Sequence, residues 1–164
     1  MTSDAQDELR TAAPKRKAAF LQRGHLAAFA QPAALTTILG SCVSVCLWDA
    51  RRGQGGMNHF LLPDWAGQSE SSARYGDVAV ELLVGKLAVL GSPTTDLQAK
   101  LFGGACVLAP FREGKRHLGL QNVDAAKRML AEARIEIVAE DTGGDRGRKL
   151  VFNTDDGSAF VRRL

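Results

Sequence analysis

Three cysteines and three histidines are the residues of this chain best suited to nucleophilic or metal chemistry. They are Cys42, Cys46, Cys106, His25, His59 and His117. A thiolate attacks acyl carbons or binds zinc, and a neutral imidazole serves either as a general base or as a metal ligand. The surroundings of these residues therefore have to decide between a cysteine-dependent hydrolase, a zinc site and ordinary packing.

Cys42 stands in a different local context from the other two cysteines. It follows Gly40 and Ser41, and a glycine permits an unusual backbone angle or the close approach of another molecule. The peptide N–H groups of a sharp Gly-Ser turn can point at one spot and stabilise an oxyanion. Cys46 lies within an apolar extended run and Cys106 follows Gly-Gly-Ala, so both are predicted to pack as small hydrophobic residues. For Cys42, the pattern leaves both the nucleophilic and the packing role open.

The alternation of residues 41–48 argues against a zinc ion shared by Cys42 and Cys46. The period of two is typical of a β-strand and puts both cysteines on one face. Four residues of a strand span about 13 Å, which is too far for a disulfide or for two ligands of one metal ion. A structural zinc module is therefore an alternative that this geometry opposes. Its ligands would be Cys42, Cys46, Cys106 and His59.

His59 is the histidine best placed to act as a base. His25 lies near the N-terminal segment and His117 follows the charged loop at residues 112–116, so surface positions are expected for both. His59 follows Gly55-Gly56 in an extended run that would present it on the face opposite Phe60. A short strand–turn–strand connection joins it to Cys42. Taken alone, His59 can equally be a structural histidine with satisfied hydrogen bonds.

The remaining sequence predicts an α+β fold, in which helices pack on a mixed, partly antiparallel β-sheet within a single domain. Turn residues separate the extended segments, and helical spacing of apolar residues marks two helices. Asp155-Asp156-Gly157 is a hairpin turn, and Gly91 and Pro93 end the first helix. Strands are expected at residues 35–39, 41–48, 55–62, 98–102, 135–140, 149–152 and 158–162, and helices at residues 71–90 and from the predicted N-cap Asn122 through Ala133.

Composition narrows the class of protein. The 164 residues are 45% hydrophobic and 24% charged with a formal net charge of +3, as expected for one soluble globular domain. The chain lacks about 18 consecutive apolar residues, so no membrane-spanning helix is expected. The charge surplus is too small to indicate nucleic-acid binding, although it favours an acidic protein partner. An odd number of cysteines indicates reduced thiols and hence a cytoplasmic protein.

The first 24 residues have a different character from the rest. Asp4, Asp7 and Glu8 precede any apolar run, so no secretory signal is expected. The segment is rich in alanine and basic residues, which predicts a flexible tail at residues 1–24 followed by the folded domain at residues 25–164. The basic run at residues 15–17 leaves open a short docking segment.

An ordered set of motifs resembles the CheD family, the chemoreceptor glutamine deamidases of bacterial chemotaxis. The resemblance covers roughly residues 35–157, with the motifs in order and only short gaps between them. These motifs are Leu39-Gly40-Ser41-Cys42-Val43, Gly55-Gly56-Met57-Asn58-His59-Phe60, Arg74-Tyr75-Gly76, residues 99–105, Gly119-Leu120-Gln121-Asn122 and residues 141–149.

The resemblance implies a cysteine-dependent amidohydrolase with a Cys–His–Thr site and an α/β sandwich fold. Residue by residue, it assigns the nucleophile to Cys42, the base to His59 and the third member to Thr36. Thr36 is preferred because its six-residue spacing to Cys42 matches the family, with the adjacent Thr37 as the alternative. No metal or organic cofactor is implied.

The resemblance also implies a substrate and a partner. The enzyme would convert glutamine to glutamate on the cytoplasmic helical region of chemoreceptors, the methyl-accepting chemotaxis proteins, and could hydrolyse glutamyl methyl esters. The phosphatase CheC is implied as a regulatory partner, with no nucleic acid and no membrane insertion. A non-catalytic interaction domain that only docks on receptors or signalling proteins is the alternative from another class.

Overall fold

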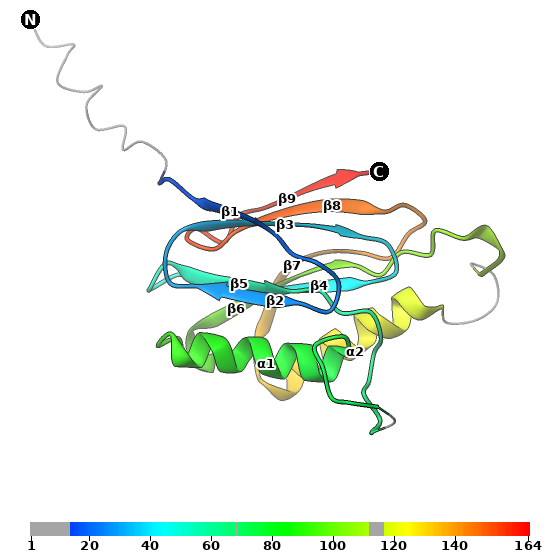
Figure 1. Ribbon diagram of the computed structural model, residues 1–164, viewed down its shortest axis with the longest axis horizontal. Helices are drawn as coiled ribbons and strands as arrows, with labels where there is room; N and C mark the ends of the chain where they lie inside the picture. The colour runs from blue at the N-terminus through cyan, green and yellow to red at the C-terminus, as the bar shows by residue number, and fades with distance from the viewer. Residues whose placement is uncertain (1–13, 68, 112–116) are drawn as a thin grey trace, which may run out of the picture.

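Two β-sheets lie one above the other, and two helices cover the outer face of one of them (Figure 1). The computed structural model describes residues 14–67, 69–111 and 117–164. The four-stranded sheet has the order β1 (Lys17–Phe20), β3 (Ala33–Leu39), β8 (Arg148–Asn153) and β9 (Ala159–Arg163). The five-stranded sheet has the order β2 (Leu26–Phe29), β5 (Gln54–Asn58), β4 (Val43–Asp49), β6 (Leu97–Gly103) and β7 (Glu136–Thr142).

Both sheets are mixed. The pairs β1–β3 and β6–β7 are parallel, whereas the other strand pairs are antiparallel. The helices are α1 (Gly76–Val89) and α2 (Leu118–Glu132), and short 3₁₀ turns occupy Thr94–Asp96 and Ala109–Phe111. The predicted α+β class with helices packed on a mixed sheet is therefore confirmed, and the second sheet is an addition to it.

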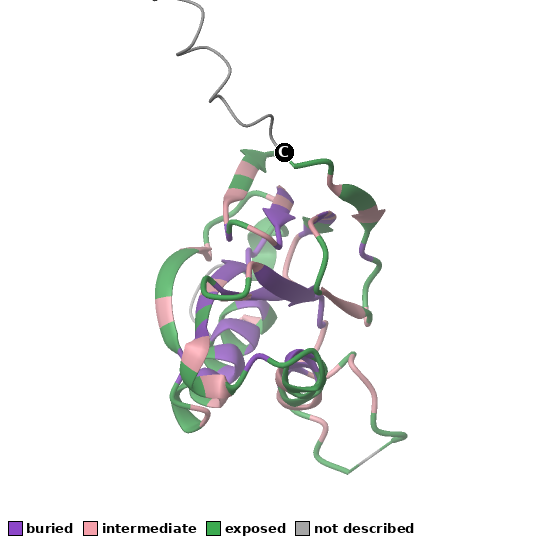
Figure 2. Cartoon of the chain, turned by 90° about the vertical axis from the view of Figure 1, so that its left-hand side faces the viewer, coloured by how far each residue is buried: buried purple, intermediate pink, exposed green. Residues whose placement is uncertain are grey.

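Strand β4 separates two hydrophobic clusters, as its alternation predicts. Val43, Val45 and Leu47 pack with α1 and α2 on one side of the five-stranded sheet. Cys46 packs on the other side, in the cluster between the two sheets. Buried residues gather along the central strands and on the sides of the helices that face them (Figure 2). Among the described residues, no helix is long and apolar enough to cross a membrane.

Helix α1 begins at Gly76 rather than at the predicted residue 71. The preceding segment pairs with another part of the chain, because the Arg74 carbonyl accepts hydrogen bonds from the N–H groups of Leu61 and Leu62. Residues 72–75 form a turn, in which the Tyr75 N–H donates to the Ser72 carbonyl at 3.2 Å, and Tyr75 itself is extended. The helix ends before Gly91, whose φ of +100° is accessible to glycine, as predicted.

The N-cap of α2 is His117, so the prediction that placed it at Asn122 is wrong. The Nδ1 of His117 accepts the N–H of Leu120 at 3.3 Å. Asn122 lies within the helix, fully buried, and its side-chain amide bonds to two carbonyl groups outside the helix. The side chain that looked like a cap is used for tertiary contacts instead.

Part of the predicted N-terminal tail is a strand of the four-stranded sheet. Residues 17–20 form β1, which pairs in parallel with β3, and Leu21 is buried directly after it. Arg16 forms ion pairs with Asp155 at 2.7 Å and Asp156 at 3.1 Å. The first half of the tail, residues 1–13, lies outside the described residues. A four-residue strand has little sequence signal, because the neighbouring strand supplies its hydrogen bonds.

Two glycines, the last residue of β6 and the one after it, hold the segment that carries Cys42. The N–H of Gly104 donates to the Cys42 carbonyl at 2.9 Å, and the N–H of Ala105 donates to the Gly40 carbonyl at 2.9 Å. Gly103 has a φ of +108° and Gly104 a φ of +71°. A Cβ at Gly103 would overlap the Cys42 carbonyl, so only a residue without a side chain permits this close approach.

We expect Gly104→Ala to lower the free energy of unfolding by about 2 kcal/mol or more, because of left-handed backbone strain and overpacking. A Cβ there would lie 2.7 Å from the Gly119 carbonyl oxygen. The matched control is Gly85→Ala in α1, where an added Cβ meets no atom within 4 Å. This substitution should stabilise the helix by about 0.5–1 kcal/mol, because alanine is a better helix former than glycine. Urea unfolding measures both changes, and a shift of the same sign in the two variants contradicts the analysis.

Candidate active site

Cys42 and His59 line one open pocket at the edge between the two sheets. Its volume is about 690 Å³. The lining comes from the connection after β1, from the end of β3 and the turn after it, and from the residue after β5. These residues are Phe20, Leu21, Gln22, Arg23, Thr37, Ile38, Gly40, Ser41, Cys42 and His59.

A backbone bridge next to both residues explains why Cys42 and His59 share a face. Val43 and Phe60 exchange two hydrogen bonds, of 3.1 Å from the Val43 N–H and 3.0 Å from the Phe60 N–H. Their side chains point to the helices. Because side chains alternate along an extended chain, Cys42 and His59 point the other way, toward the four-stranded sheet. The predicted orientation of His59, opposite to Phe60, is therefore confirmed.

A chain of two hydrogen bonds fixes the tautomer of His59. The Thr37 hydroxyl lies 2.7 Å from the Leu21 carbonyl oxygen and 2.8 Å from Nδ1 of His59. A carbonyl only accepts, so the single hydroxyl proton of Thr37 goes to Leu21. The hydroxyl oxygen must then accept from His59, which puts the imidazole proton on Nδ1. The Nε2 atom is left as an unprotonated nitrogen, buried and without a hydrogen-bond partner among the described residues.

The hydroxyl that reaches His59 belongs to Thr37 and not to Thr36, so the preferred register is off by one residue. Alternate residues of β3 point between the sheets, and Thr37 belongs to this inward set with Leu35 and Leu39. Thr36 points to the opposite, partly exposed face of the strand. Counting residues from Cys42 does not reveal this, because the chain leaves the strand at Gly40 before it reaches the cysteine.

Burial disfavours the charged forms of both His59 and Cys42. Desolvation lowers the pKa of His59 from 6.5 to about 4, and the positive charge of Arg23 acts in the same direction. Desolvation also raises the pKa of the Cys42 thiol, although Arg23 and the N–H of Cys42 itself oppose the rise. The resting pair is therefore a thiol and a neutral imidazole, in which Nε2 can accept the thiol proton.

Two backbone contacts hold His59 from the side of β2. The N–H of His59 donates to the His25 carbonyl at 3.0 Å, and the N–H of Gly24 donates to the His59 carbonyl at 2.7 Å. The side chain of His25 itself is exposed. Residues 24 and 25 thus hold His59 through their peptide groups, which a pattern of side-chain types does not reveal.

Asn122 ties together the two segments that carry Cys42 and His59. Its Nδ2 donates to the Ser41 carbonyl at 3.0 Å and to the Leu61 carbonyl at 2.9 Å. Ser41 precedes the cysteine, and Leu61 follows the histidine by two residues. This role was not predicted from the sequence, in which Asn122 is an N-cap candidate and part of the Gly119–Asn122 motif.

The N–H groups of Ser41 and Cys42 are available for a ligand. Within the part of the chain that the structure describes, neither donates a hydrogen bond to another residue. The peptide N–H of Cys42 lies close enough to its own thiol to oppose the rise of its pKa. Two adjacent unengaged N–H groups next to a thiol are suited to hold an anionic oxygen that develops at an attacked carbonyl.

The other two cysteines are packed. Cys46 lies in the cluster between the sheets, and burial strongly raises its pKa. The thiol of Cys106 donates to the Leu108 carbonyl at 3.5 Å. Across residues 14–67, 69–111 and 117–164, no three His, Cys, Asp or Glu side chains are grouped as metal ligands. The four proposed zinc ligands therefore do not come together.

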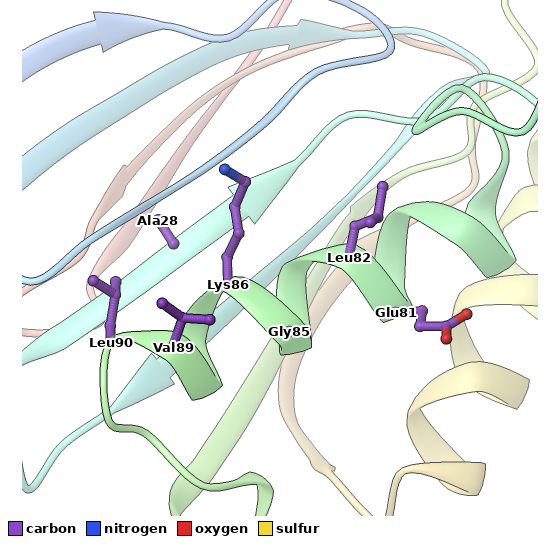
Figure 3. A pocket seen from close by; sticks show the side chains of 7 residues that line it. All are labelled: Ala28, Glu81, Leu82, Gly85, Lys86, Val89 and Leu90. Atoms are coloured by element: carbon purple, nitrogen blue, oxygen red, sulfur yellow. The ribbon is translucent and has the colours of Figure 1, made fainter.

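A second concavity runs along α1, away from Cys42. Leu82 and Val89 from α1, Leu90 directly after it and Ala28 from β2 give it apolar lining, and Glu81 and Lys86 line it too (Figure 3). It contains neither a thiol nor an imidazole. Of these two pockets, the one at Cys42 and His59 is thus the one that holds a thiol and an imidazole.

Comparison with known proteins shows what this chain is similar to. A family model described as CheD chemotactic sensory transduction matches residues 61–163. The probable chemoreceptor glutamine deamidase CheD 1 of Anaeromyxobacter dehalogenans is 51% identical, over 91% of this chain and 86% of that protein. The probable chemoreceptor glutamine deamidase CheD of Trichlorobacter lovleyi is 42% identical, over 88% of this chain and 89% of that protein. The chemoreceptor glutamine deamidase CheD of Thermotoga maritima is 37% identical, over 86% of this chain and 88% of that protein.

Replacing Thr37 with valine should release the tautomer of His59. The variant removes the hydroxyl but keeps the shape, so Nδ1–H and the Leu21 carbonyl lose their partner at a cost of about 1–3 kcal/mol. Imidazole ¹⁵N chemical shifts at neutral pH should show the Nδ1–H form in the wild type and a mixture in Thr37→Val. Thr36→Val is the control and should keep the wild-type spectrum. The reverse outcome would restore the Thr36 register.

The lowered pKa of His59 predicts a specific loss of stability in mild acid. Between pH 6.5 and about 4 the unfolded chain binds a proton that the folded chain does not. The free energy of unfolding should therefore fall as the pH falls through this window, by roughly 3 kcal/mol at most. Urea titrations at several pH values measure the slope.

His59→Gln removes the ionisable group and should flatten this slope. The control is His25→Gln, which should keep the wild-type slope because that side chain is exposed in the folded protein. Parallel slopes for the wild type and His59→Gln would show that other groups cause the pH dependence.

Proposed function

The chain belongs to the CheD family, and we propose that it is a protein-glutamine deamidase that acts on chemoreceptors with Cys42 as its nucleophile. Three relatives are named as deamidases of this kind and match most of its length. The observation that carries the chemical proposal is the directed Leu21–Thr37–His59 hydrogen-bond chain beside Cys42. It supports a base at Nε2 facing a pocket that holds a thiol.

In the first half of the reaction, Nε2 of His59 takes the thiol proton while Sγ of Cys42 attacks the side-chain carbonyl carbon of a glutamine. The peptide N–H groups of Ser41 and Cys42 receive the oxyanion, and one such donor is worth about 3 kcal/mol in related chemistry. The new imidazolium keeps its Nδ1–H bond to Thr37. It then returns its Nε2 proton to the leaving nitrogen, so the C–N bond breaks and ammonia departs.

In the second half, water hydrolyses the thioester. Nε2 of His59 accepts a proton from the water, whose oxygen adds to the acyl carbon, and the C–S bond breaks. Sγ of Cys42 regains its proton, and the product is glutamate. The same thioester would form from a glutamyl methyl ester with methanol as the leaving group, so the proposal includes esterase activity. No step requires a group beyond these side chains, peptide N–H groups and water.

The substrate in this proposal is the helical cytoplasmic region of a chemoreceptor. Glutamines on the exposed face of a coiled coil lie outside the apolar seam, so an enzyme can reach them. The net charge of +3 suits a partner rich in glutamate. The proposal extends, on the family resemblance, to a cytoplasmic location and to CheC as a regulatory partner.

We expect Cys42→Ala to abolish the conversion of receptor glutamine to glutamate and to remain folded, because the position is only partly buried. Mass spectrometry of a receptor cytoplasmic fragment, incubated with wild type and variant, detects each conversion. Cys46→Ala and Cys106→Ala are the matched controls. They should deamidate, with some loss of stability from the cavity in the case of the fully packed Cys46.

The reactivity of the thiols provides an independent check. Iodoacetamide should modify Cys42 faster than Cys46 and Cys106, because an accessible thiol next to a base reacts while a buried one is inert. Full deamidation by Cys42→Ala would show that the proposed nucleophile is wrong. Absence of deamidation by every form, including the wild type, would remove the proposed function and leave a docking domain.

A further inference from the structure

Arg23 lies at the mouth of the Cys42–His59 pocket, in the connection between β1 and β2, and its side chain is exposed. Within the described ranges it forms no ion pair, whereas six of the other arginines there do. The paired arginines are Arg16, Arg51, Arg52, Arg128, Arg148 and Arg163. No aspartate or glutamate is among the residues that line the pocket. A positive charge without a counter-ion therefore stands beside the reacting groups.

The surroundings of Arg23 favour an incoming carboxylate. Phe20 is 60% exposed and Ile38 is 50% exposed, and both line the same pocket. When a partner covers these apolar side chains, water is displaced around the guanidinium, which strengthens its pairing with an anion. The effect of Arg23 on the ionisation of both Cys42 and His59 shows that its charge is felt at the reacting atoms.

We propose that Arg23 is a specificity-determining residue that selects glutamines with a carboxylate side chain one helical turn away on the same face. Side chains three or four positions apart on a helix are neighbours, with Cβ atoms about 5–6 Å apart. When a glutamine of the helix enters the pocket, a carboxylate three or four positions away therefore lies at the mouth of the pocket, beside Arg23. This inference rests on the proposed deamidase function and adds to it the chemical class of sequence that the site prefers.

The test uses three helical receptor fragments, each with a single reactive glutamine. They differ at one position, four residues away from that glutamine, which is glutamate, alanine or lysine. For the wild type, kcat/KM for deamidation should be highest with glutamate, exceeding alanine by about fivefold, and lowest with lysine. Arg23→Gln should bring the three values close together. Arg23→Glu should reverse the order and favour lysine. Added salt should reduce the wild-type preference, because the pair is partly exposed.

Arg162→Gln is the matched control, since Arg162 is an exposed arginine in β9 that lies outside the pocket and forms no ion pair among the described residues. It should keep the wild-type order. If Arg23 acted only through the ionisation of Cys42, Arg23→Gln would change all three rates by one factor, and the inference would be overturned. Equal wild-type rates on the three fragments would overturn it as well. A wild type inactive on every fragment would instead refute the proposed function.

Discussion

The proposed chemistry of the site depends on one acceptor, the carbonyl oxygen of Leu21. Because it cannot donate, it takes the only proton of the Thr37 hydroxyl, and Thr37 in turn takes the Nδ1 proton of His59. The direction of both bonds follows from that one peptide group. Leu21 and Thr37 belong to the four-stranded side and His59 to the five-stranded side. The basic nitrogen of the site is thus defined by the stacking of two sheets.

Stacking alone does not bring Cys42 to this nitrogen, and a second set of contacts maintains the register. Gly104 binds the Cys42 carbonyl, and the amide of Asn122 binds the carbonyls on either side of the reacting pair. These contacts use peptide groups and a buried amide, so they leave both reacting side chains free. A rigid backbone around an unengaged thiol and an unengaged Nε2 is the arrangement that lowers the cost of reaching a transition state.

The burial of Cys42 and His59 has opposite consequences before and during the proposed reaction. Burial and Arg23 disfavour an imidazolium at His59, and burial raises the pKa of Cys42 against the effect of Arg23, so the resting thiol keeps its proton. The same burial strengthens each hydrogen bond to charge that develops in the transition state. With a neutral pair of this kind, His59 deprotonates the Cys42 thiol as it attacks a bound substrate. The thiol is not permanently ionised.

The sequence by itself indicated the two faces of β4 and the β8–β9 hairpin, because turn residues and a period of two are local properties of a strand. It left the roles of Cys42 and His59 open, and only the family resemblance assigned them. It did not distinguish Thr36 from Thr37, since two adjacent threonines differ only in the face that the strand turns toward the other sheet. It also missed β1, the role of Asn122 and the exposed charge of Arg23. Strand pairing, bonds to distant carbonyls and the absence of a counter-ion are relations between segments far apart in the chain, so only the tertiary structure decided them.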